Sequence, residues 1–396
     1  MLSFNPKKTN CMGCSACCSA CPKQCIAMQK DDEGFLYPIV DDAICIDCGL
    51  CKKVCPMVNP KIENNHHKTA VAAVSKDYKI WRRSASGGAF SEIVRNWADD
   101  TTLIVGAAWD GLNVHHIGVI GFDNIAPLCR SKYVSSAIEN TFIEIREQLR
   151  CGKKAIFCGC PCQVDGLRRF LRKDNENLLT MDLICHGQGS PDVFRETMSV
   201  IGEQLGESIL SYEFRAKRKI HETDYLALVK TEKGNHYLTQ DPYIQLFLSQ
   251  NALRPSCGEN CKYRDVRRPG DLTIADCKGL TKIYPDLVGT KKNYSTVVSN
   301  TPKGDMVLKA LEKTMLVRSC PIDEVIKYNP LFARQTWFSK DRDKFFEEFK
   351  KDPKAAIRNW TKPYKHTEFT WKKRVCSFLP ESLMRVYINM QEKKKK

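Results

Sequence analysis

Short apolar runs alternate with amphipathic segments along the middle of the chain. Residues 70–74 and 103–109 are apolar runs of strand length, and the segment between them repeats apolar side chains at the spacing of one helical face. Alternation of this kind is typical of a sheet whose strands are joined by helices. The helical face is formed by Phe90, Ile93, Val94 and Trp97.

Two further strand and helix units follow in the same order. Residues 154–157 form a predicted strand that leads into Cys162 and a helix, and residues 178–184 form a strand that leads into Cys185 and a helix over 191–205. Right-handed crossovers bring the carboxyl ends of parallel strands to one edge of a sheet, where ligands bind. We therefore expect Cys162 and Cys185 to face one cleft.

The first 56 residues carry the string Cys-x-x-Cys-x-x-Cys-x-x-x-Cys-Pro twice, with a predicted hairpin between the copies. Three cysteines in each copy bind one cubane, and the fourth reaches the other cluster. The repeat therefore predicts two 4Fe-4S clusters and resembles a two-cluster bacterial ferredoxin. A zinc site would need two cysteine pairs and a longer spacer, and disulfides would need a secreted chain. One predicted ligand set is Cys11, Cys14, Cys17 and Cys55, and the other is Cys21, Cys45, Cys48 and Cys51.

Composition narrows the class of protein. The chain has 396 residues, 21 of them cysteines, and a net charge of +16. It has no apolar leader and no apolar stretch long enough to span a membrane, so we expect a cytoplasmic protein whose cysteines serve metal and redox chemistry. We expect no nucleic-acid partner, because no zinc finger, recognition helix or RNA-binding motif gives the charge a geometry.

The positive charge is concentrated near the C-terminus. Residues 340–396 hold 17 Lys and Arg against 8 Asp and Glu, a balance of +9. Pro380 followed by apolar residues at spacings of three and four predicts a short basic amphipathic helix. Such a helix packs on the protein's own body, lies on an anionic membrane surface or docks an acidic partner.

Residues 84–88 offer a candidate anion site. Ser86, Gly87 and Gly88 precede a predicted helix, where free backbone N-H groups and the helix dipole favour a phosphate. The alternative is a serine N-cap with a glycine turn.

Four isolated cysteines are candidate ligands of a third 4Fe-4S cluster, although scattered cysteines are often packing residues. These are Cys162, Cys185, Cys257 and Cys261. His186 could supply a proton beside Cys185, or it merely forms a hydrogen bond within a turn.

Five motifs resemble, in the same order, those of the coenzyme F-420 hydrogenase/dehydrogenase beta-subunit family. The resemblance covers about residues 70–300. The motifs are Ser-x-Ser-Gly-Gly at 84–88, Ser-Lys-Tyr-Val-x-Ser at 131–136, Cys-Pro-Cys-Gln-Val-x-Gly-Leu at 160–167, Leu-Ile-Cys-His-Gly at 183–187, and Cys-x-x-x-Cys at 257–261 followed by Gly-Asp-Leu-Thr-Ile-Ala-Asp at 270–276.

The resemblance implies an iron-sulfur flavoprotein that passes electrons between clusters and FAD, and hydride to or from a second substrate. In similar proteins that substrate is a deazaflavin or a tetrapyrrole. The resemblance also supports the third cluster and implies FAD contacts from Ser86, Gly87, Gly88, Lys132, Tyr133 and Ser136.

The chain departs from the family pattern at Cys160, where similar proteins often have a threonine, and at Cys277-Lys278, where an aromatic pair often follows the aspartate. Both cysteines are alternative ligands of the third cluster, and the substrate face stays unassigned. We expect an oxidoreductase with an unidentified small-molecule substrate and a ferredoxin or another redox protein as partner. The alternatives are an electron-transfer subunit that feeds a partner enzyme and a coenzyme F-420:ferredoxin oxidoreductase. Self-association is a further expectation.

The fold class expected from these patterns is α+β and multidomain. Residues 1–62 should form a two-cluster ferredoxin fold, residues 68–325 an α/β FAD-binding domain with iron-sulfur ligands, and residues 326–396 a helical basic region.

Overall fold

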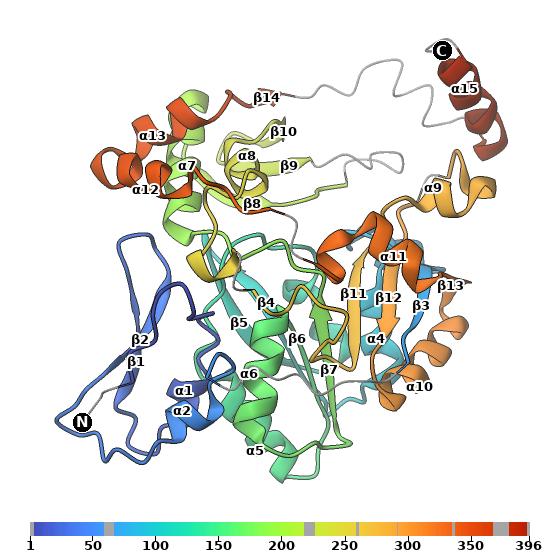
Figure 1. Ribbon diagram of the computed structural model, residues 1–396. Coiled ribbons are helices and arrows are strands. Elements are labelled where there is room, and N and C mark those ends of the chain that lie inside the picture. Colours follow the sequence, from blue (N-terminus) through green and yellow to red (C-terminus); the bar gives the residue numbers. More distant parts are fainter. Residues whose placement is uncertain are drawn as a thin grey trace.

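The N-terminal region forms a small unit built around a hairpin. A computed structural model describes residues 4–58, 67–217, 226–258, 261–290, 292–334, 337–366 and 380–393. The antiparallel strands β1 (Ile26–Lys30) and β2 (Leu36–Val40) lie between the short helices α1 (Ala16–Ser19) and α2 (Leu50–Val54). This confirms the hairpin predicted between the two cysteine motifs, and Figure 1 shows the unit at one side of the molecule beside α6.

The body of the protein is an eight-stranded mixed sheet in the order β13-β3-β12-β11-β7-β6-β4-β5. The four strands β11, β7, β6 and β4 are parallel, as the strand and helix pattern predicts, and the flanking pairs are antiparallel. The bounds are β3 (Thr69–Ser75), β4 (Leu103–Asp110), β5 (Asn113–Ile120), β6 (Ala155–Gly159), β7 (Leu178–Leu183), β11 (Leu272–Asp276), β12 (Ser295–Ser299) and β13 (Met315–Ser319).

Helices cover both faces of this sheet because successive side chains of each strand point to opposite faces. On one face, Ile104 and Ile156 pack against α4 (Ala89–Trp97) and α10 (Pro302–Ala310). On the other, Val105 and Phe157 pack against α5 (Thr141–Arg150) and α6 (Pro161–Leu171). Shorter helices at the edges are α3 (Tyr78–Arg82), α9 (Leu280–Ile283) and α11 (Ile322–Tyr328).

A second sheet lies above the first in Figure 1 and has the order β14-β10-β9-β8. It shares an apolar core with four helices, so residues of the C-terminal part pack against the middle of the chain. The strands are β8 (Ile209–Glu213), β9 (Ala227–Thr231), β10 (Asn235–Thr239) and β14 (Lys365–His366), and the helices are α7 (Pro191–Leu205), α8 (Pro242–Leu248), α12 (Arg342–Lys351) and α13 (Pro353–Trp360).

Two buried arginines anchor the ferredoxin unit to the body. Arg254 donates hydrogen bonds to the carbonyl oxygens of Cys11 (2.8 Å) and Leu36 (2.6 Å), and its guanidinium lies 4.3 Å from the centre of the Tyr37 ring. Arg342 of α12 forms a buried ion pair with Glu33 at the hairpin. Removing one partner of a buried ion pair is costly. The cysteine motifs are therefore held at a fixed position relative to the large sheet.

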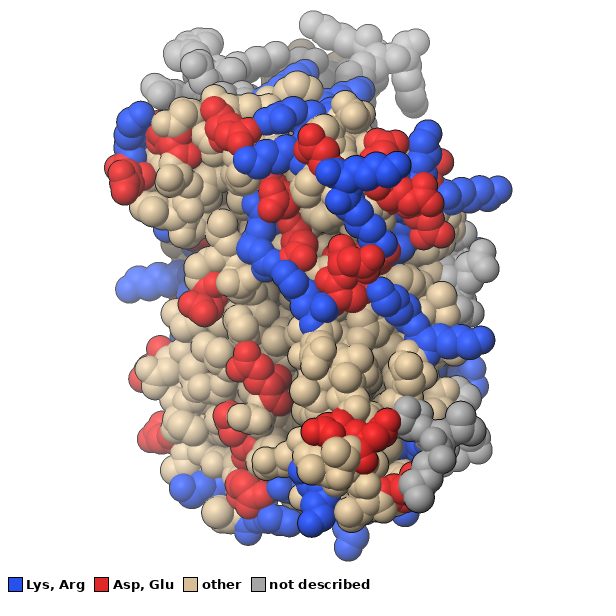
Figure 2. Space-filling model, turned by 90° about the vertical axis from the view of Figure 1, so that its left-hand side faces the viewer, with Lys and Arg blue, Asp and Glu red and all other residues tan. Residues whose placement is uncertain are grey.

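The face that carries the ferredoxin unit has no single sign of charge. Figure 2 shows acidic and basic side chains intermixed in its upper part, whereas the middle is largely uncharged. Among the ion pairs in this region are Lys350 with Asp32 (2.7 Å) and Lys8 with Asp31 (2.6 Å).

The predicted tail helix is present as α15 (Glu381–Lys393). Its apolar stripe is exposed: Leu383, Val386 and Met390 have exposed fractions of 52%, 55% and 56%. Arg385 attaches the helix to the body by donating to the carbonyl oxygens of Val288 (3.1 Å) and Asp286. Contact of the stripe with a membrane stays a prediction. Among the described residues, no helix has the length and apolar character needed to cross a bilayer.

Candidate electron-transfer centres and cofactor cavity

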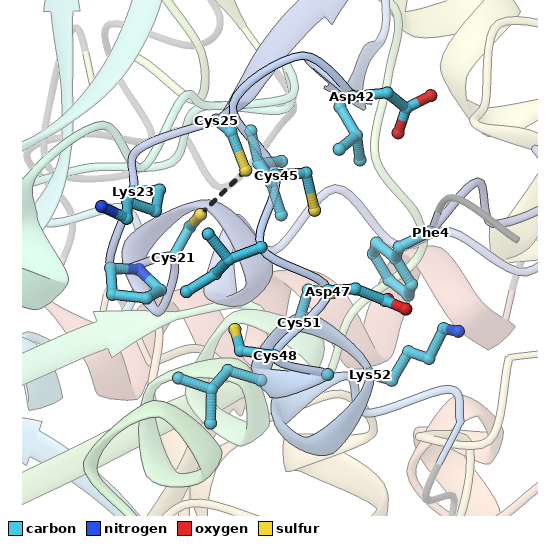
Figure 3. Close-up of a pocket in the computed structure, with 16 residues that line it drawn as sticks. Phe4, Cys21, Lys23, Cys25, Asp42, Cys45, Asp47, Cys48, Cys51 and Lys52 are labelled. Carbon is cyan, nitrogen blue, oxygen red and sulfur yellow. Dashed lines mark hydrogen bonds between the residues drawn. The ribbon is translucent and has the colours of Figure 1, made fainter. Parts of the chain in front are cut away.

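One of the two predicted ferredoxin ligand sets surrounds a cavity. A space of about 220 Å³ is lined by Cys21, Cys45, Cys48 and Cys51, which come from both copies of the motif. Cys25 lines the same space, and its sulfur lies 3.3 Å from that of Cys21, as Figure 3 shows. A donor set of thiols from two loops fits a 4Fe-4S cluster. Cys48 is exposed, so this site lies at the surface.

The other predicted ferredoxin set is more deeply buried. Cys14 and Cys17 are buried, and Cys11 and Cys55 lie near enough to influence both thiols. Burial, with a smaller contribution from the neighbouring thiols, raises the pKa of the Cys14 thiol to about 12. Such thiols stay protonated unless a metal takes the place of the proton. The set therefore has the composition and burial that a cluster requires.

Five cysteines converge at the carboxyl edge of the large sheet. The sulfurs of Cys160 and Cys185 are 3.8 Å apart. Gln188 connects two other thiols, since its side chain donates to Cys162 Sγ (3.2 Å) and its backbone N-H donates to Cys257 Sγ (3.3 Å). We call this the five-cysteine group; its members are Cys160, Cys162, Cys185, Cys257 and Cys261.

The surroundings of the five-cysteine group suit an anionic cluster. Arg264 is buried, and its Nε and Nη1 groups have no hydrogen-bond partner among the described residues. The hydrogen bond between Cys185 and Cys160 and the one from the Gly187 N-H, together with the Arg264 and Arg268 cations, lower the pKa of Cys185 to about 7 despite its burial. Within the described part of the chain, no three His, Cys, Asp or Glu side chains are placed to hold a single metal ion. A cubane has several iron atoms and accepts more widely spaced thiols.

The buried ferredoxin set is adjacent to the five-cysteine group. A Cβ atom added to Gly166 of α6 would lie 3.0 Å from Cys14 Sγ. On the other side of this contact, Met12 packs in one apolar cluster with Cys162 and Tyr263. The buried ferredoxin set therefore lies next to the five-cysteine group, and Cys17 of that set packs in one cluster with Cys21 and Cys45 of the exposed cavity.

A larger cavity of about 680 Å³ borders the five-cysteine group, since Cys160 and Cys185 line it. Its wall has several basic side chains, among them Arg130 and Lys278, and an ion pair between Arg215 and Asp276. The volume and the mixed polar and apolar wall are typical of a cofactor site. Six residues singled out from the sequence line this cavity: Ser86, Gly88, Lys132, Tyr133, Ser136 and His186.

Gly87 has a different position from its neighbours. Its backbone N-H donates to Ser295 Oγ (2.9 Å), and a Cβ atom at this residue would overlap the carbonyl oxygen of Ala73. Gly87 is not among the residues that line the cavity. The structure therefore explains this glycine by the close approach of its backbone to β3 and β12.

Two predicted site residues have unusual protonation equilibria. Burial lowers the pKa of Lys132 to about 8, and its amino group donates to the carbonyl oxygens of Pro127 (2.9 Å) and Cys129 (2.7 Å). Burial also lowers the pKa of His186 to about 4, so its ring is neutral near pH 7. The Nε2 atom lies 3.1 Å from the carbonyl oxygen of Phe247, which fixes the proton on Nε2. This arrangement leaves His186 poorly suited to donate a proton into the cavity.

Sequence reasoning missed His116, which also lines the cavity. Its Nδ1 atom lies 2.9 Å from Ser136 Oγ, and its ring stacks on Phe157. Burial lowers the pKa of His116 to about 4. Nothing in the sequence distinguishes it from its neighbour His115.

The motif at residues 270–276 is mainly structural. Asp271 accepts hydrogen bonds from Arg168 Nη2 (3.0 Å) and from the N-H and hydroxyl of Thr180 (both 2.8 Å). Cys277 packs with Trp81 and not with the five-cysteine group. Of the two alternative ligands expected from the sequence, the structure therefore brings only Cys160 to the group.

Comparisons with known protein families give two matches along this chain. Residues 152–325 match the family described as the C terminus of the coenzyme F420 hydrogenase/dehydrogenase beta subunit, and residues 10–59 match the 4Fe-4S dicluster domain. Among solved structures, the chain is similar to one from the xenon-derivatised F420-reducing [NiFe] hydrogenase complex of Methanosarcina barkeri. The identity is 16% and the TM-score 0.44, over 74% of this chain and 90% of that chain. No curated protein matches the chain.

Proposed function

We propose that this chain, whose residues 152–325 match the C terminus of the coenzyme F420 hydrogenase/dehydrogenase beta subunit and whose residues 10–59 match the 4Fe-4S dicluster domain, is an iron-sulfur flavoprotein oxidoreductase. It would relay electrons between three 4Fe-4S clusters and FAD, with hydride transfer to or from a small-molecule substrate. The observation that carries this proposal is the shared wall: Cys160 and Cys185 belong to the five-cysteine group and also line the 680 Å³ cavity. When bound, clusters carry single electrons and a flavin exchanges them for hydride.

The residues of this chain would divide the task as follows. The two ferredoxin sets would hold two clusters, and exposed Cys48 marks the end at which a redox partner exchanges electrons. Cys162, Cys185, Cys257 and Cys261 would hold the third, with Cys160 beside them. Basic side chains of the cavity, Lys132 and Arg130 among them, would hold the phosphates of FAD. Apolar residues of the wall such as Ile184 and Phe247 would exclude water.

Two alternative functions are compatible with the same cofactor sites. An electron-transfer subunit that feeds a partner enzyme would bind the same cofactors but would turn over no metabolite. A coenzyme F-420:ferredoxin oxidoreductase would reduce or oxidise that deazaflavin. Assay of the purified protein with coenzyme F-420 and with other hydride acceptors distinguishes these alternatives.

The iron and flavin contents of the protein test the proposal. After anaerobic purification and reconstitution we expect about twelve irons per chain, because each cubane holds four, and about one non-covalent FAD. About eight irons and no flavin, even after FAD is supplied, would leave a ferredoxin module and would contradict the proposal.

A further inference from the structure

Arg264 is the buried cation of the five-cysteine group. Only 7% of its surface is exposed, and its Nη2 atom donates to the carbonyl oxygen of His186 (3.0 Å). The Nε and Nη1 groups have neither a hydrogen-bond partner nor an acidic side chain within 4 Å among the described residues. Two other buried arginines of this region have partners: Arg268 is paired with Asp182 at 2.8 Å, and Arg254 donates to the carbonyl oxygens of Cys11 and Leu36.

A buried cation without an anion is costly, so a partner for Arg264 is expected on physical grounds. Among the ionisable groups that feel the charge of Arg264 are the thiols of Cys185 and Cys261 and the ring of His186, and of these only the thiols can supply a negative charge. Arg264 also follows Cys261 closely in the chain, and its backbone N-H donates to the Cys261 carbonyl oxygen, with an N to O distance of 3.4 Å. The unpaired guanidinium groups are therefore placed beside the thiols that would carry the third cluster.

We propose that Arg264 neutralises the third cluster and raises its reduction potential. This inference rests on the proposed function, which supplies the cluster. Reduction adds one negative charge, and a fixed cation with free N-H donors stabilises the reduced form more than the oxidised form. Hydrogen bonds and charge near the sulfurs are established determinants of cluster potential. Arg264 is thus a positioning residue: its charge favours the reduced form of the third cluster, which lies next to the cavity.

Replacement of Arg264 should lower the midpoint potential of one cluster only. The measurement is an anaerobic redox titration followed by electron paramagnetic resonance, with the third cluster identified as the signal lost in Cys162→Ser. In Arg264→Gln we expect at least a tenfold less favourable reduction equilibrium, which is a downward shift of about 59 mV for one electron. Arg264→Lys keeps the charge and should lie between the two.

Arg267 provides the matched control. It is exposed and paired with Asp265 at 2.7 Å, so Arg267→Gln removes a nearby cation without touching the five-cysteine group. The midpoint potential of the third cluster in Arg267→Gln should equal that in the parent protein. An unchanged potential in Arg264→Gln, with about twelve irons retained, would overturn this inference and leave the proposed function intact.

Loss of iron has a defined meaning in this experiment. If Arg264→Gln loses about four irons, the Arg264→Lys variant shows whether the charge or the fold is responsible. A third-cluster signal near the parental potential in Arg264→Lys supports the role of the charge, whereas loss of iron there too shows that Arg264 only maintains the fold. A parent with about eight irons would contradict the proposed function as well.

Discussion

Replacement of Cys162 by serine is expected to lower the iron content from about twelve to about eight atoms per chain. Cys162 lies at the start of α6, where Gln188 donates to its sulfur and where Cys185 and Cys257 are close by. Loss of one thiolate from a buried cluster site should prevent assembly of that cluster. The two ferredoxin sets have no ligand on α6 and should keep their iron. Iron analysis of the anaerobically reconstituted variant measures this.

Two further cysteine variants sharpen the result. Cys277→Ser is the matched control, because Cys277 is partly buried but packs with Trp81, and its iron content should stay at the parental value. Cys160→Ser separates the fifth thiol from the four proposed ligands, and it too should retain about twelve irons. An iron content of about twelve in Cys162→Ser would contradict the proposed ligand set of the third cluster.

The Gly106→Leu variant is expected to lose its flavin and keep its iron. Gly106 of β4 lines the large cavity, and a Cβ atom there would make only ordinary contacts, the nearest at 3.6 Å from Leu128. Additional bulk should therefore occupy cofactor space without displacing the backbone. A steric cost to FAD binding above about 1.4 kcal/mol would lower the affinity for FAD more than tenfold. Flavin released by heat denaturation and measured by absorbance, relative to iron, gives the result.

Gly106→Ala is the control for this variant, since a methyl group fits and should leave the flavin content near that of the parent. Gly87→Val would be a poor test, because a side chain there overlaps Ala73 and would damage the sheet itself. If Gly106→Leu carries a full complement of FAD, the cavity is not the flavin site.

The parts of the site that could be predicted depend on local pattern and on sheet topology. The cysteine spacing within residues 11–56 predicts loops that bring Cys21 to Cys45, Cys48 and Cys51, and these four line one cavity. Cys162 and Cys185 follow adjacent parallel strands, which is why their convergence could be expected from the order of strands and helices.

The parts that could not be predicted depend on contacts between distant segments. Gly87 approaches Ser295, which lies 208 residues away, a contact that the local pattern of residues 84–88 does not indicate. Contact of this loop with FAD stays a prediction. Arg254 and Arg342 fix the ferredoxin unit through contacts with Cys11 and Glu33 that no spacing indicates. The burial of Arg264 could not be predicted either, because nothing in the sequence of a basic chain distinguishes a buried arginine from an exposed one.

The same reasoning explains the different outcomes for Cys160 and Cys277. Both depart from the family pattern and both lie near a proposed cofactor in the sequence motifs. Cys160 follows β6 at the edge where Cys185 also lies, whereas Cys277 follows β11 and packs in an apolar cluster with Trp81 and Tyr294. Side-chain direction at a strand end, which the motif alone does not fix, separates them.

Reduction of the flavin by a reduced ferredoxin tests the relay most directly. In an anaerobic rapid-mixing experiment, reduced ferredoxin should bleach the flavin absorbance of the parent protein. The same reagent should bleach it much more slowly in Cys162→Ser, which keeps the two outer clusters but lacks the one beside the cavity. Clusters that become reduced while the flavin of the parent stays oxidised would contradict the account.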